Sequence, residues 1–258
     1  MKEIFGNLVA SFKEVFPKGG GHRWRAFGLI LIASVIPLSQ LFVIRVFSGM
    51  ILHTTKNLDV KEIVLNFLLF FALFGSTHLA TYWQKVYRVK VFERAFAAGE
   101  RKVTKYKESW EWALAFEMSN LLHMATTALV LIVFFASINI WMGLLNVVVV
   151  VISFEIIGVI YRRQMATQKG FAEARDKKQQ IDTAVRVGSR IRSGEFGTLM
   201  TSIGYIVLLA VLLLLKLQDL IVAADAITLF LGMRMQNSNL SNVSGALMRY
   251  ARARAQAD

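Results

Sequence analysis

The chain has 258 residues, of which 55% are hydrophobic, and its 30 Lys and Arg residues against 17 Asp and Glu residues give a net charge of +13. The apolar share exceeds the roughly 45–50% of soluble domains, which excludes a disordered chain and favours a membrane protein. The absence of Cys excludes a disulfide scaffold, a thiolate metal site and a cysteine nucleophile.

Residues 1–21 are predicted to form an amphipathic helix that lies on the membrane surface. Apolar residues recur there at helical spacing on one face, and Pro17 and the glycines at 19–21 end the pattern. The segment lacks the continuous apolar core and the small-residue cleavage site of a signal peptide. A flexible, soluble start of the chain is the alternative.

Residues 22–248 are predicted to form an all-α domain of six transmembrane helices. A span needs about 20 mostly apolar residues, and a helix is the default because lipid offers no partners for backbone amides. The segments that meet this length, or nearly so, are approximately 26–52, 63–84, 119–138, 140–161, 199–217 and 219–236. The first of them is interrupted by Pro37, Gln40 and Arg45, and the sixth by Asp225 and Arg234.

The basic residues alternate with the apolar segments. Four stretches, 1–25, 85–111, 162–197 and the basic tail 249–258, hold 25 of the 30 Lys and Arg residues, whereas the three intervening turns hold Lys56, Lys61 and Lys216. The positive-inside rule therefore predicts that both termini and both long loops are cytoplasmic, in a bacterial inner or plasma membrane. Because this topology accounts for the charge, nucleic acid is not an expected partner.

The two long loops are predicted to be helical rather than linkers. Residues 84–117 and 162–192 contain no Pro and are rich in helix-forming residues. We therefore expect the membrane helices to continue beyond the bilayer as long rods.

Two short runs support a family resemblance. The first apolar segment carries SVIPL at 34–38 and RVFSG at 45–49, and the sixth opens with IVAADAIT at 221–228. With the six-span pattern, they make the chain resemble the transmembrane domain of ABC exporters. The resemblance implies an elbow helix before span 1, a homodimer, and spans 2–3 and 4–5 that extend inward to coupling helices touching ATPase domains.

The chain departs from that family in two ways. It contains no G-x-x-x-x-G-K-[ST] motif, so it cannot hydrolyse ATP by the P-loop route, and ATP would act only through a separate polypeptide. The second of the two long loops is also shorter than the corresponding inward extension of the family, which argues against a coupling helix around 188–197. No nucleophile motif is present and the four His residues are scattered, so we expect no enzyme, cofactor or metal site.

Three charged residues fall inside the apolar segments: Glu155, Arg45 and Arg234. A charge at this depth is costly, so each is predicted to face other helices or water. For Glu155, one interpretation is a proton-coupling carboxylate, and the other is a cavity-facing group paired with Arg45 or Arg234 or lying near the cytoplasmic end of its helix. Alternatively, the long side chain of Arg45 carries its charge to the outer membrane interface.

The end of the sixth segment is unusually polar, with Gln236, Asn237, Asn239 and Asn242 among several Ser residues. Such a helix cannot face lipid, so it is predicted either to line a cavity or to pack against a partner helix, including that of a second copy.

Aromatic and charged residues gather before the third segment, at Trp110, Trp112, Lys105 and Lys107. This patch is interpreted either as a docking site for a cytoplasmic partner or as an aromatic belt at the membrane interface.

Three functions follow from these observations. The first is a transporter subunit that works by alternating access with a separate ATPase polypeptide. The second is an ATPase-independent, proton-coupled transporter on the same fold, with Glu155 as the coupling residue. The third is a non-transporting accessory or scaffold subunit of a larger membrane complex. The substrate and its direction of movement are not encoded in any motif.

Overall fold

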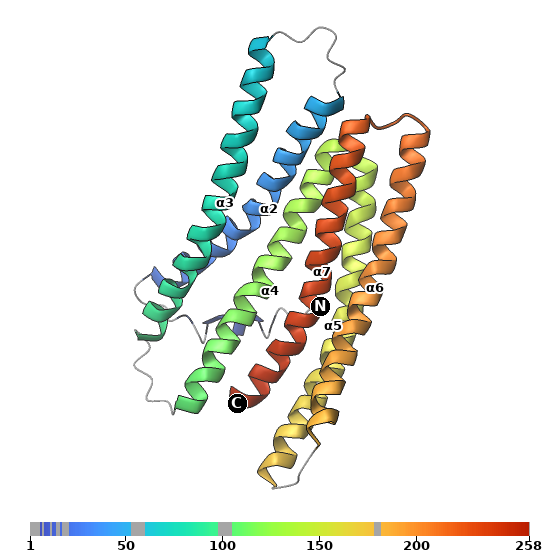
Figure 1. The fold of residues 1–258 in the computed structure, drawn as a ribbon. Coiled ribbons are helices and arrows are strands. Elements are labelled where there is room, and N and C mark those ends of the chain that lie inside the picture. The colour runs from blue at the N-terminus through green and yellow to red at the C-terminus, as the bar shows by residue number, and fades with distance from the viewer. Residues whose placement is uncertain are drawn as a thin grey trace.

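The structure is a computed structural model that describes residues 6, 8–10, 12–13, 16, 21–52, 60–97, 105–177 and 182–257. Its described elements, labelled as in Figure 1, are all long α-helices. They are α2 (His22–Leu52), α3 (Val60–Ala97), α4 (Lys105–Ile138), α5 (Ile140–Asp176), α6 (Thr183–Leu217) and α7 (Ala223–Ala257).

Five of these helices are long and apolar enough to cross a membrane: α2, α3, α4, α5 and α6. The chain is therefore an all-helical protein with the helices of a membrane protein. The helix that contains the expected sixth span, α7, has 35 residues but is not in this set, because its composition is too polar.

The helices run up and down in sequence, which gives the bundle two ends. We call the end where α2, α4 and α6 finish the turn end, and the end where α3, α5 and α7 finish the basic end. Figure 1 shows the turn end at the top. The expectation that the apolar segments continue as helical rods is confirmed, because α3, α4, α5 and α6 have 38, 34, 37 and 35 residues.

The most polar helix occupies the centre of the bundle. α7 packs against α2, α4, α5 and α6, whereas α3 lies at the edge and packs mainly along α2 (Figure 1). At the basic end α3 also reaches α4, where the Phe92 and Phe116 ring centroids are 5.0 Å apart. A central helix meets little lipid, so its polar composition is tolerated.

Local chemistry fixes the helix boundaries. Asn139 separates α4 from α5 and accepts a hydrogen bond from the Met142 amide at 3.1 Å, as an N-cap does. Asp182 caps α6 in the same way, through the Ala184 amide at 3.0 Å. Between α6 and α7 the turn places Asp219 at a φ of 54°, a left-handed conformation that Asp tolerates better than most residues.

Two large apolar clusters and a small third one, made of Ala128, Val150 and Leu240, form the core. One lies toward the turn end and includes Leu41, Phe135 and Leu229. The other lies toward the basic end and joins α3, α4, α5 and α7 through residues such as Met118 and Ile157.

The expected amphipathic helix falls largely outside the described residues. Of that segment, Leu8 and Phe16 are buried in the basic-end cluster, and the Arg23 Nε donates a hydrogen bond of 2.8 Å to the Phe16 carbonyl. At the other end of the chain, residues 249–257 continue α7, and Tyr250 is fully buried. The expected tail therefore begins within a helix that belongs to the bundle.

Candidate functional site

The polar part of α7 presents two different faces. Gln236 is 1% exposed, and both of its amide atoms lack a hydrogen-bond partner among the described residues. Asn239 is half-buried and donates from Nδ2 to the Met124 carbonyl of α4 at 2.8 Å. On the outward face, Arg234, Ser238 and Asn242 are exposed at four-residue spacing. We call these three residues the polar stripe.

If α7 crosses a membrane as the sixth span, the polar stripe falls between the middle of the hydrocarbon layer and its edge. Counting about 20 residues of span from the start of α7 at Ala223 places the far edge of the hydrocarbon layer near Asn242. Arg234 then lies near the middle of the layer, about 16 Å along the helix from Ala223. An exposed arginine there is unfavourable in lipid, so the stripe requires water or a polar partner.

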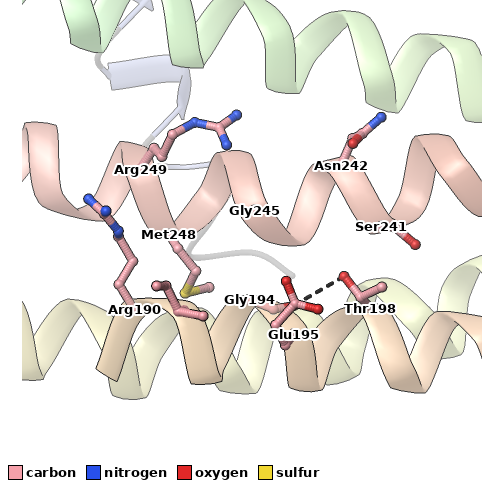
Figure 2. Close-up of a pocket in the computed structure, with 10 residues that line it drawn as sticks. Arg190, Gly194, Glu195, Thr198, Ser241, Asn242, Gly245, Met248 and Arg249 are labelled. Atoms are coloured by element: carbon pink, nitrogen blue, oxygen red, sulfur yellow. Dashed lines mark hydrogen bonds between the residues drawn. The ribbon is translucent and has the colours of Figure 1, made fainter. Parts of the chain in front are cut away.

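A pocket of about 420 Å³ opens between α6 and α7 at the basic-end limit of the stripe. It is lined by Arg190, Ile191, Gly194, Glu195, Thr198, Ser241, Asn242, Gly245, Met248 and Arg249. In Figure 2 the Arg190 and Glu195 side chains extend from α6 toward α7, and Met248 extends from α7 toward α6. One polar residue expected to line a cavity, Asn242, is therefore in a pocket.

Small residues bring α6 and α7 together beside this pocket. The Ser244 hydroxyl donates to the Gly194 carbonyl at 3.1 Å, and the Thr201 and Ser241 hydroxyls are 3.1 Å apart. At Gly197, an added Cβ would overlap the Ser244 side chain. Such close approach through small residues is a common way for membrane helices to associate, and it fixes the walls of the pocket.

The charges around the pocket are mostly positive. Arg190 is close enough to Arg249 and Arg252 for their charges to act on it, and it has no ion pair within the described parts of the chain. Arg249 is partly neutralised, because its Nε lies 2.5 Å from the Glu117 Oε1 of α4. Glu195 is exposed and is the acidic residue in the pocket lining.

The three charged residues expected inside the membrane lie on three different helices, α2, α5 and α7. Arg45 lies 3.1 Å from Asp225 and forms an ion pair that joins α2 to α7 near the turn end. This pair gives Arg45 an acidic partner other than Glu155. Glu155 is exposed on α5 and does not line the pocket, while Arg234 is on the polar stripe of α7.

The aromatic patch on α4 is built into the bundle. Trp112 is half-buried and lies 4.8 Å, centroid to centroid, from Phe96. Trp110 is also half-buried, and the Arg252 guanidinium lies 5.2 Å from the centroid of its ring. The side chains of Lys105 and Lys107 lie outside what the structure describes.

Sequence reasoning did not single out Arg190, Gly194 and Glu195 on α6, or the buried Asn146 on α5. Asn146 is 0% exposed, and both atoms of its amide are without a partner in the described residues. A polar residue in the run LLNVVV, which the sequence shows plainly, was the available signal for Asn146. The pocket residues carried no comparable signal, because they lie in a basic stretch that topology alone explains.

Within the described residues, no group of three or more His, Asp or Glu side chains is arranged to hold a metal ion. Comparison with known proteins finds no family model and no curated protein that matches this chain.

Proposed function

We propose that this chain is the membrane subunit of a transporter related in architecture to ABC exporters, in which α7 is the sixth span and lines the path of the substrate. One observation carries the proposal: the polar stripe, Arg234, Ser238 and Asn242, is exposed along α7, the helix that crosses the membrane in this proposal. Lipid cannot solvate these groups, so a water-filled path or a second copy must cover them.

The basic end supplies the surface for a partner. A span uses about 20 residues, so helices of 34–38 residues extend roughly 21–27 Å beyond the hydrocarbon layer. In this proposal a separate ATPase polypeptide binds these rods, two copies of the chain form the pore, and alternating access moves the substrate. Both termini and the basic end face the cytoplasm.

Purification of the tagged full chain under native conditions, followed by mass spectrometry and an ATPase assay, tests the proposal. A P-loop ATPase that co-purifies at about one copy per chain supports it. A homodimer without an ATPase contradicts the split arrangement and favours proton coupling. A large assembly without an ATPase contradicts transport and favours an accessory subunit.

The exposure of the polar stripe is tested separately. Because the chain has no Cys, single substitutions Ser238→Cys and Asn242→Cys give one reactive site each. We expect both to react with a membrane-impermeant thiol reagent or to cross-link two copies. The control, Leu213→Cys, lies on α6 and is 64% exposed on an apolar surface, so it should do neither. A substrate path along α7 would be contradicted if all three cysteine variants failed equally to react with the reagent and to cross-link.

A further inference from the structure

We propose that the pocket between α6 and α7 binds the headgroup phosphate of an anionic phospholipid. The proposal does not depend on transport. It rests on the charge of the pocket, its depth in the membrane and the apolar surface that leads into it.

The charge of the pocket favours an anion. Arg190 is half-buried and lacks an acidic partner among the described residues, while Arg249 and Arg252 add positive charge nearby. An unpaired guanidinium next to other cations is stabilised by a phosphate, which accepts several charge-assisted hydrogen bonds. Basic pockets between membrane helices on the cytoplasmic side are typical binding sites for acidic lipid headgroups.

The other polar groups suit the oxygens of a headgroup. Thr198, Ser241 and Asn242 line the same pocket as Arg190. An added Cβ at Gly194 would have as its only near neighbour the Met248 Cγ, at 3.9 Å, so the wall there is open. Among the lining residues, Glu195 is the acidic one and disfavours an anion. Removing its charge should therefore strengthen binding.

The depth of the pocket matches the headgroup layer. About 20 residues counted from Leu217 along α6 place the edge of the hydrocarbon layer near Thr198, and the same count along α7 places it near Asn242. Arg190 and Arg249 lie about 10–12 Å farther along their helices. The pocket therefore runs from the hydrocarbon edge through the layer of lipid phosphates.

An apolar track leads from the pocket into the membrane. Leu199, Ile203 and Ile206 follow Ile191 and Glu195 along α6 and are 56%, 49% and 63% exposed. An acyl chain on these residues would keep its headgroup at the pocket. This continuity favours a lipid over a free anion as the occupant.

The test is a lipid titration of the full chain in detergent, read by native mass spectrometry. The probes are phosphatidylglycerol, phosphatidylcholine with the same acyl chains, and inorganic phosphate. We expect phosphatidylglycerol to be retained about fivefold more strongly than phosphatidylcholine, the effect of roughly one basic residue near an anionic lipid. Equal retention of the two lipids, or binding of inorganic phosphate without a preference for phosphatidylglycerol, would overturn the proposal.

Variants locate the site. Arg190→Gln should weaken the retention of phosphatidylglycerol about fivefold, and Glu195→Gln should strengthen it. Gly245→Leu, which fills the pocket and keeps its charges, should also weaken it. Arg192 is exposed and does not line the pocket, so Arg192→Gln is the matched control and should have no effect. An equal effect of Arg192→Gln and Arg190→Gln, or weaker retention with Glu195→Gln, would contradict this site. Circular dichroism confirms that each variant is folded.

Discussion

Helices α3 and α7 differ in where they lie in the bundle and in how much of their surface is buried. α3 lies at the edge of the bundle, and only 6% of its most apolar stretch is buried. α7 lies at the centre, and it buries Thr228, Gln236 and Ser244 almost completely. In water the exposed helix would be the polar one, whereas lipid reverses this preference. Composition therefore reports what surrounds a helix, and α7 is surrounded mainly by protein.

The two helices also differ in the chemistry of their exposed residues. The exposed residues of α3, such as Leu65, Leu68 and Phe71, are apolar and suit lipid directly. The exposed residues of α7 include Arg234 and Ser238. α7 therefore has one face without a suitable neighbour in the single chain, and this face is the basis of the proposed function.

The largest expected effect comes from a charge placed on the lipid-facing helix. Leu68 on α3 is 63% exposed, and Leu68→Arg should disfavour membrane insertion by about 3 kcal/mol. Ser238→Arg on the polar stripe should cost much less, because this face is not covered by lipid in the proposal. A glycosylation-mapping insertion assay measures both. Equal costs would show that the two exposed faces meet the same environment.

The second largest effect is expected when a glycine at a helix contact is replaced by a larger residue. At Gly197 of α6, facing α7, a Cβ would overlap Ser244, whereas at Gly75 of α3 it would meet nothing within 4 Å. Gly197→Leu should therefore destabilise the protein by about 2 kcal/mol, as overpacking typically does. Gly75→Leu is the matched control and should not destabilise it. Thermal unfolding in detergent gives both values, and a stable Gly197→Leu variant would contradict the close α6–α7 contact.

A smaller effect, in this case stabilising, is expected on the buried face of α7. Gln236 is buried with no partner for its amide among the described residues, so Gln236→Leu should stabilise the protein by about 1 kcal/mol. Asn239→Leu removes the 2.8 Å hydrogen bond to the Met124 carbonyl and should destabilise it. Chemical unfolding in mixed detergent measures both. Destabilisation by Gln236→Leu would indicate that the amide has a partner in the membrane.

The smallest effect is expected where α3 meets α2. The Thr77 and Ser39 hydroxyls lie 2.5 Å apart, and hydrogen bonds between membrane helices contribute about 0.6 kcal/mol on average. Thr77→Val should lower the unfolding free energy by that amount, measured under the same conditions. A loss as large as that of Gly197→Leu would mean that a polar contact, rather than apolar packing, holds α3 in place.

Much of this architecture was predictable from the sequence. Five of the six predicted apolar segments lie within described helices, and α7 begins four residues into the sixth, 219–236. The helix formers of residues 84–117 and 162–192 indicated the long rods. Local rules were sufficient there, because a span needs length and hydropathy, and a rod needs helix propensity. The low hydropathy of the sixth segment was equally visible, and it is the reason that α7 stands apart from the five apolar helices.

The site was predicted only in part. The polar run of α7 pointed to a cavity or a partner, and Asn242 does line a pocket. The sequence could not show that Arg45 pairs with Asp225, since the two residues are 180 positions apart and meet only when α2 packs on α7. It also could not select Arg190 from the basic residues of its stretch.

The sequence by itself determined the membrane character, the helices and the side on which positive charge gathers, because each of these depends on residues close together in the chain. Only the tertiary structure decided which helix is central and which face of α7 is left without a neighbour. It also placed Arg190 and Asn242 around one pocket. Those properties depend on how the helices pack. Packing is set by small residues such as Gly197, which look the same in sequence whether they meet a neighbour or lipid.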